Sequence, residues 1–243
     1  MRCSSSLLLA ALLLSASAAS AQTTFRLGLR GGANLALTTL DPASSFSGSY
    51  ANTYATSKPA LLAGQAGLVA EVGFGKLALQ PALLFSQKGE RVVHTYDSYG
   101  AVSTDHYAIT STNRYNWLEL PLHMVYTLRG THGLQLFAGP YAAWAVGGHL
   151  QGDSALTTLP RGRQSTSFAK TIRYGPGTGN SRFDAGFNFG LGYRQGPVQV
   201  QLLYGLGLLN LHRPGADYAP SPAYYGAAYN RVAQLTGTYF FQR

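Results

Sequence analysis

The stretch that decides the fold is Phe183-Asp-Ala-Gly-Phe-Asn-Phe-Gly-Leu-Gly-Tyr-Arg194, in which every second residue is apolar. The residues between them, from Asp184 to Arg194, are small, polar or charged. Because successive side chains of a β-strand point to opposite faces, this stretch is predicted to be a strand with one apolar and one polar face. In a soluble sandwich the apolar face would cover a core. In an outer-membrane barrel it would contact lipid, and the polar face would line the lumen.

The same two-residue alternation occurs in eight segments, each long enough for a tilted membrane crossing. Pro81, Pro121 and Pro140 fall inside them, and because proline cannot donate to a ladder we expect bulges or irregular pairing there. The predicted strands are Phe25–Leu35, Leu62–Phe74, Lys76–Lys88, Arg114–Tyr126, Leu134–Val146, Phe183–Arg194, Val198–Leu211 and Asn230–Phe241.

The connections between these segments alternate in length. Short turns on one side and long loops on the other are typical of an outer-membrane barrel, whereas such long loops are uncommon in compact soluble domains. An even number of strands also returns both termini to the short-turn, periplasmic side. The fold class is therefore predicted as all-β, an eight-stranded antiparallel up-and-down transmembrane β-barrel. The predicted short turns are Gly73–Lys76, Thr127–Gly133 and Gln195–Pro197, and the predicted long loops are Ala36–Leu61, Gly89–Asn113, Gly147–Ser181 and His212–Tyr229.

Residues 1–21 have the features of a cleaved signal peptide. Arg2 provides a positive start, Leu7–Leu14 is a short apolar stretch, and Ala19-Ser20-Ala21 is a small-x-small cleavage signal. We therefore expect residues 22–243 to form one barrel domain in the outer membrane of a Gram-negative cell envelope. The single cysteine, Cys3, would leave with the signal peptide, which excludes disulfides, thiolate metal sites and cysteine nucleophiles from the mature chain.

The formal net charge of +9 suggests an anionic partner. Export argues against nucleic acid, so we expect contact with outer-membrane lipid and lipopolysaccharide, and with the barrel-assembly machinery during insertion. The third long loop has a positive bias that favours anionic lipid, with an ordinary solvated loop as the alternative. Its cations are Arg161, Arg163, Lys170, Arg173 and Arg182. Nothing in the sequence indicates the oligomeric state.

The polar faces of the predicted strands carry a nearly balanced set of charges. Slipping a strand by one residue would move these charges into hydrocarbon, at about 2–4 kcal/mol for an arginine near the bilayer centre. Several such penalties would rival a typical net stability of about 5–15 kcal/mol, so the set is predicted to face the lumen. Its members are Arg26, Arg30, Glu71, Glu119, Asp184 and Arg194.

Eight strands enclose a space that side chains just fill. Balanced inward charges then favour a lumen plugged by ion pairs over an open channel. Arg26 and Glu71 lie close to the short-turn rim on adjacent predicted strands, so we expect a cross-strand pair between them.

Five stretches carry a resemblance to a known family, and two of them, Phe183–Tyr193 and Tyr204–Leu211, resemble its later strands. Leu77-Ala-Leu-Gln-Pro-Ala-Leu-Leu-Phe-Ser-Gln-Lys-Gly89 resembles the LxxQPELLYSQKG strand of the Bacteroidota-type outer-membrane β-barrel family, which includes porin-family and PorT-like proteins. Trp117-Leu-Glu-Leu-Pro-Leu122 resembles its YLEIPL strand, and Phe137-Ala-Gly-Pro-Tyr141 its GPYxG segment. The similarity covers nearly all of the mature chain and implies an eight-stranded, membrane-embedded barrel without catalytic residues. Ala82 stands where the family often carries Glu, so a lumen contact of that carboxylate is missing here.

The sequence predicts no catalytic, cofactor or metal site. Glu119 and His123 share a strand face, but four residues along a strand is about 13 Å, too far for a direct acid–base couple. Four loop histidines leave a weak metal rim as an alternative to solvated side chains. These are His94, His106, His149 and His212.

Several functions remain open. We expect a structural, adhesive, or transport- or secretion-accessory barrel; a small-solute porin and a lipid or peptide hydrolase are the alternatives. The polar inward side and continuously apolar outward side argue against a soluble, lipocalin-like barrel.

Overall fold

The computed structural model describes residues 23–40, 52–99, 104–130, 132–159, 161–211 and 228–241. The predicted signal peptide lies outside these residues, as does most of the predicted loop His212–Tyr229. Within them, no helix is long and apolar enough to cross a membrane. The strands are β1 (Thr23–Leu40), β2 (Asn52–Ser57), β3 (Leu61–Phe74), β4 (Leu77–Tyr99), β5 (Thr104–Thr127), β6 (Gly133–Leu159), β7 (Gly162–Thr171), β8 (Phe183–Gln195), β9 (Val198–Gly207) and β10 (Ala228–Phe240).

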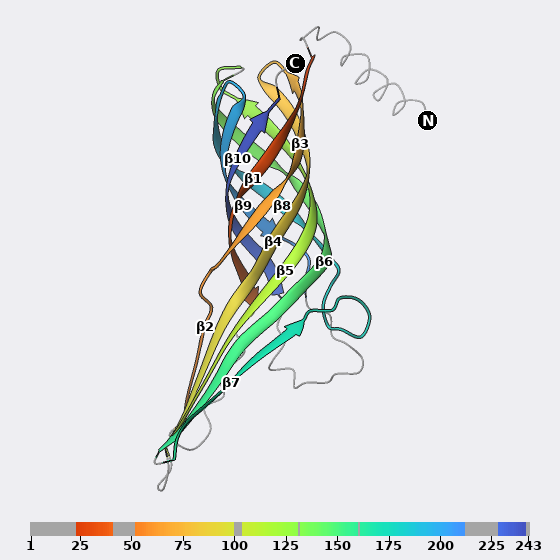
Figure 1. The fold of residues 1–243 in the computed structure, drawn as a ribbon. Helices are drawn as coiled ribbons and strands as arrows, with labels where there is room; N and C mark the ends of the chain where they lie inside the picture. The colour runs from red at the N-terminus through yellow and green to blue at the C-terminus, as the bar shows by residue number, and fades with distance from the viewer. Residues whose placement is uncertain are drawn as a thin grey trace, which may run out of the picture.

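Eight of these strands close into a ring in the order β1-β3-β4-β5-β6-β8-β9-β10, and β10 pairs back onto β1. All neighbours are antiparallel, which confirms the predicted eight-stranded up-and-down barrel (Figure 1). The first and last described strands meet at one rim, where the Phe241 amide donates to the Leu27 carbonyl at 2.7 Å. The short connections lie between β3 and β4, β5 and β6, and β8 and β9, as predicted.

The two faces of the barrel wall follow the predicted alternation. On β8, Phe187 and Leu191 are half exposed on the outside, whereas Asp184 and Asn188 are buried inside. The pattern is the reverse of a soluble barrel, in which the apolar side chains would be inside. Its physical reason is that hydrocarbon solvates the outer wall, while the polar side chains solvate one another in the lumen.

The three predicted long loops that are described over most of their length all contain β-structure. β4 continues to Tyr99, β5 begins at Thr104 and β6 ends at Leu159, so these strands run beyond the barrel. The short strands β2 and β7 pair with β4 and β6 and complete a five-stranded sheet. We call this part the blade: 52–57, 90–99, 104–113, 148–159 and 162–171. Figure 1 shows it projecting from the long-loop end of the barrel.

The prolines cause no bulge, but each interrupts one ladder, as the prediction of irregular pairing expected. Pro81 has no partner in the β3–β4 pairing, Pro121 none in the β4–β5 pairing and Pro140 none in the β5–β6 pairing. The register is the same on both sides of Pro81 and Pro121, and Pro140 stays opposite Phe187 on β8. The side chains of Pro81 and Pro140 point outward, so each ring replaces a lipid-facing residue without moving the strand. The register shift between β5 and β6 lies instead at Asn116/Trp117, where Gly147 and Ala145 are the partners on β6.

Candidate functional site: the polar lumen

The short-turn half of the lumen is organised around one carboxylate, that of Glu71 on β3. Arg26 Nη1 on β1 lies 3.0 Å from Glu71 Oε1, which confirms the pair predicted from the sequence. Arg194 Nη1 on β8 donates to both Glu71 oxygens at 2.7 and 2.8 Å. Gln80 Nε2 on β4 donates a further hydrogen bond to Glu71 Oε2 at 2.7 Å. Arg26 is opposite Glu71 in the β1–β3 register, so strand pairing alone places that contact.

The pair between Glu71 and Arg194 crosses the whole lumen. β3 and β8 are four places apart in a ring of eight strands, so they are opposite walls. Both side chains are buried, at 2% and 4% exposure. The guanidinium of Arg194 also lies over the Phe240 ring, 4.6 Å from its centroid. A buried charge with this number of donors is compensated in place and does not need water.

Arg30 and a row of amides extend this cluster. Arg30 donates to Gln80 Oε1 and to Thr238 Oγ1, both at 3.0 Å. Gln199 Nε2 on β9 donates to Gln135 Oε1 on β6 at 2.7 Å. Gln135 in turn donates to Thr127 at 2.8 Å, so amide side chains connect walls that do not pair through their backbones.

A second cluster occupies the long-loop half of the lumen. Lys88 Nζ lies 2.6 Å from Glu119 Oε2, and both side chains are 1% exposed. The same ammonium lies 4.5 Å from the centroid of the Tyr141 ring. Tyr141 donates its hydroxyl to Asp184 Oδ2 at 3.0 Å, and Asn230 donates to the same oxygen at 2.8 Å. Together the contacts link β4, β5, β6, β8 and β10.

All six predicted lumen residues lie on the inner face, but they do not form one group. Arg26, Arg30, Glu71 and Arg194 belong to the first cluster, whereas Glu119 and Asp184 belong to the second. The sequence prediction left out Lys88, although the alternation of its strand assigns it to the polar face. That alternation was the signal that could have found it.

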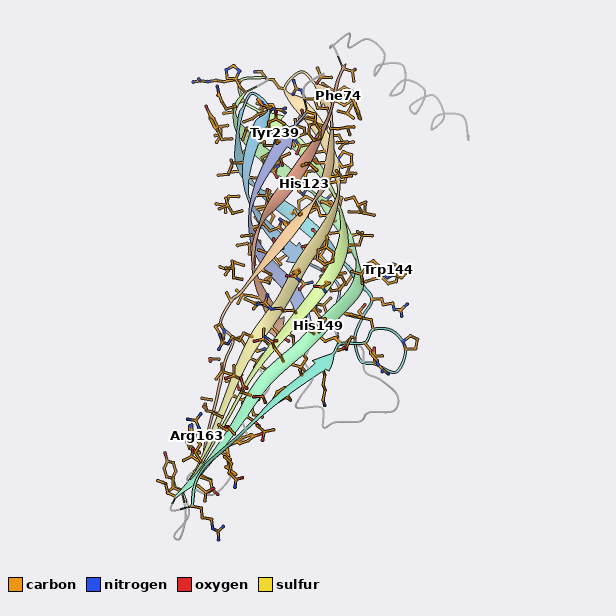
Figure 2. All side chains as sticks on the ribbon, viewed as in Figure 1. Phe74, His123, Trp144, His149, Arg163 and Tyr239 are labelled. Carbon is orange, nitrogen blue, oxygen red and sulfur yellow. The ribbon has the colours of Figure 1, made fainter. Side chains whose placement is uncertain are left out.

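His123 and Glu119 have separate partners. His123 Nε2 lies 3.2 Å from the amide of Asn188, while Glu119 pairs with Lys88. Figure 2 shows His123 within the barrel and Trp144 on its outer wall. Of the loop histidines, His94 contacts Thr56 and His106 contacts Asp97, and His212 lies outside the described residues. In the described ranges no three His, Cys, Asp or Glu side chains gather in a metal-binding arrangement.

The predicted cationic loop does not form a single surface. Much of it is the edge strand β7, on which Arg163 pairs with Thr157 and Lys170 with Leu150. These two cations are about 23 Å apart along the strand. Figure 2 shows Arg163 at the far end of the blade. Arg161 precedes β7, whereas Arg173 and Arg182 follow it and lead back to the barrel rim.

A closed antiparallel ring of eight strands, apolar outside and charged inside, defines a transmembrane β-barrel of the outer-membrane class. Residues 19–213 match the family described as outer membrane protein beta-barrel domain, and the chain belongs to this family. The match ends before β10, the strand that closes the ring. No curated protein matches the chain.

Proposed function

We propose that this outer-membrane barrel is non-conducting, with a lumen plugged by its own side chains, and that it serves a structural or adhesive role or assists transport or secretion. The role is non-enzymatic. The single observation that carries the proposal is the buried ion pair between Glu71 and Arg194, which joins opposite walls. Contacts from Arg30 and Gln199 to strands two places away in the ring support it, as does the Lys88–Glu119 pair nearer the other rim.

The blade supports the adhesive part of the proposal. In outer-membrane barrels the short turns are periplasmic and the long connections extracellular, which places the blade outside the cell. Its sheet offers an ordered surface, because β4, β5 and β6 continue into it without interruption. An ordered surface loses less conformational entropy on contact with a partner than a flexible loop does.

The finer family assignment is also part of the proposal. The likeness of Leu77–Gly89 and Trp117–Leu122 to the PorT-like, porin-family strands supports placing the chain in that group. We also propose export through a cleaved signal peptide, insertion by the barrel-assembly machinery, and contact with outer-membrane lipid and lipopolysaccharide. N-terminal sequencing of the mature protein is expected to begin at Gln22.

The proposal is tested by conductance in planar lipid bilayers. The wild-type chain is expected to give no large, stable openings, because side chains from different walls bond to one another across the lumen. Gln201 on β9 donates across the lumen to Gln80 Oε1 on β4 at 3.5 Å. An Arg194→Ala/Gln201→Ala variant, which removes two cross-lumen side chains, is expected to give openings, and these would also show that the protein inserts. Stable openings of the wild-type barrel would favour the porin alternative and overturn the plug. A phospholipid deacylation assay with the same preparation tests the hydrolase alternative.

A further inference from the structure

A concave pocket of about 460 Å³ lies on the blade, outside the lumen. Five strands line it: Leu61 of β3, Arg91 of β4, Thr112 and Arg114 of β5, Gln151 and Asp153 of β6, and Ser167 of β7. The volume falls in the range of ordinary ligand sites. None of these residues takes part in the lumen contacts described above.

The pocket faces the same side as the lipid-contacting wall. Phe85 on β4 and Leu118 on β5 are half exposed on the outer face. Arg91 and Arg114 follow them at even spacing in an unbroken β4–β5 register, so they share that face. On β6, the register shift at Asn116/Trp117 brings Gln151 to the same face, opposite Thr112.

The pocket begins just beyond the apolar band of the wall. Gln87 donates to Asn116 at 3.0 Å and forms the first outward polar pair after Phe85 and Leu118. Arg114 lies two residues beyond Asn116, and Arg91 four residues beyond Gln87. These steps are about 7 and about 13 Å along the strands. Since the strands are tilted, the rise along the barrel axis is smaller than these steps, and we infer that the two guanidiniums lie at the level of lipid headgroups and the sugars attached to them.

The two arginines are available to an anion. Arg91 is opposite Thr112, which makes Arg91 and Arg114 diagonal cross-strand neighbours within reach of one phosphate. Among the described residues neither guanidinium forms an ion pair with a carboxylate. Arg114 Nη1 donates to the Leu62 carbonyl at 3.3 Å, across Gly89, which has no side chain in the way.

The rest of the pocket suits a sugar. Asp153 is held by Ser167, whose hydroxyl donates to its carboxylate at 2.6 Å. Thr110, Thr112 and Gln151 add hydroxyl and amide groups to the same walls. Hydroxyl, amide and carboxylate groups bind sugar hydroxyls, and a pair of guanidiniums beside them binds a phosphate, so the pocket has the chemistry that recognises a sugar phosphate.

We propose that this pocket binds the phosphorylated sugar headgroup of the outer-leaflet glycolipid, lipopolysaccharide. Arg91 and Arg114 bind a phosphate between them, and the polar side chains of β5 and β6 bind the sugar hydroxyls. A phospholipid headgroup would reach the arginines but would leave these groups unused. The inference deepens the proposed contact with lipopolysaccharide, and it rests on the proposed function for the extracellular position of the blade.

The test measures binding of lipopolysaccharide to the full chain in nanodiscs, with dephosphorylated lipopolysaccharide and inorganic phosphate as further probes. An Arg91→Gln/Arg114→Gln variant is expected to bind phosphorylated lipopolysaccharide about tenfold or more weakly, since each charge-assisted bond contributes substantially. Arg163→Gln, which removes a cation at the end of the blade, is the matched control and is expected to bind like the wild type. Heat-modifiable gel migration establishes that each variant is folded.

Two outcomes would overturn the inference. Equal binding of lipopolysaccharide by the double variant and the wild type would show that Arg91 and Arg114 do not contribute to the site. Equal affinity for inorganic phosphate and for lipopolysaccharide would make it a free-anion site. Labelling of an Arg163→Cys variant on intact cells tests the extracellular position separately, since the mature chain has no other cysteine. If Arg163→Cys is labelled but the wild type does not bind lipopolysaccharide, the pocket proposal fails while the extracellular position of the blade stands. The conductance result tests only the plugged lumen and does not bear on the pocket.

Discussion

Glu71 balances two arginines whose surroundings differ. Arg194 is buried at 4% exposure, whereas the Arg26 side chain is 31% exposed near the rim. Glu71→Gln is expected to destabilise the barrel by about 3–5 kcal/mol, because the Arg194 charge stays buried without its counter-ion. Arg26→Gln is expected to cost about 0–1 kcal/mol, because water screens that pair. Urea unfolding in lipid, followed by circular dichroism, compares the two. Equal losses of stability in the two variants would show that the contribution of Glu71 comes mainly from its pair with Arg26.

Gly139 on β6 tests how closely two strands approach. A Cβ atom at this position would lie 1.9 Å from the Leu122 carbonyl oxygen of β5. Gly139→Ala is therefore expected to cost about 1–3 kcal/mol through backbone displacement. Gly237 on β10 has nothing within 4 Å of the same position, so Gly237→Ala is expected to stay within about 0.5 kcal/mol of the wild type. Urea unfolding in lipid compares the two variants. A Gly139→Ala variant as stable as the wild type would show that β5 and β6 move apart at little cost.

Residue contacts within one strand pair could be predicted from the sequence, and contacts across the lumen could not. Arg26 and Glu71 sit on neighbouring strands, so hydrophobic alternation and turn length fix their register. The bond from Glu71 to Arg194 depends on how the ring closes, since β3 and β8 share no backbone ladder. Strand tilt and stagger set which levels of opposite walls meet, and alternation within single strands does not encode them.

At the scale of elements, the barrel strands were predictable and the blade was not. The alternation of apolar residues exists because one face contacts hydrocarbon, and it ends where the lipid ends. Thr104–Asn113 has water on both sides, and each of its residues is half-buried or exposed. Backbone pairing continues there without a hydrophobic period, so the sequence pattern suggests a loop. β7 is exposed along nearly all its length for the same reason.

The pairing of β2 with β4 in the blade is expected to depend on pH through His94. Burial, and then the charge of Lys58, lower the pKa of His94 below its ordinary value of 6.5. His94 Nδ1 also lies 2.8 Å from Thr56 Oγ1 of β2. When β2 and β4 are separated, His94 therefore takes up a proton at a higher pH than when they are paired. The stability of the pairing is complete above about pH 6.5 and falls as the pH drops toward the lowered pKa.

Hydrogen exchange of the β2 amides between about pH 5 and about pH 8 measures this effect. Protection is expected to fall on the acidic side in the wild type and to stay level in His94→Asn, which cannot take up a proton. Protection that rises on acidification would mean that the protonated ring is the better partner of Thr56.

At the scale of the whole molecule, the position of the apolar band decides which substitutions are tolerated. Leu120 on β5 is 56% exposed in the middle of the outer wall, and Leu156 on β6 is 39% exposed on the blade. Leu120→Arg is expected to cost about 2–4 kcal/mol, because it places a charge in hydrocarbon. Leu156→Arg, in water, is expected to change stability by about 0.5 kcal/mol or less. Refolding yield into bilayers and urea unfolding compare the two. Equal costs would mean that the leucines of the wall do not contact lipid.

The continuity of β4, β5 and β6 from the short turns to the end of the blade has a mechanical consequence. In an antiparallel sheet the backbone hydrogen bonds are perpendicular to the strands. A pull along the blade therefore loads many bonds in shear at the same time, instead of peeling them apart one by one. Tension from an attached surface would pass straight into the membrane-embedded wall, and the anchor would resist it as a single body.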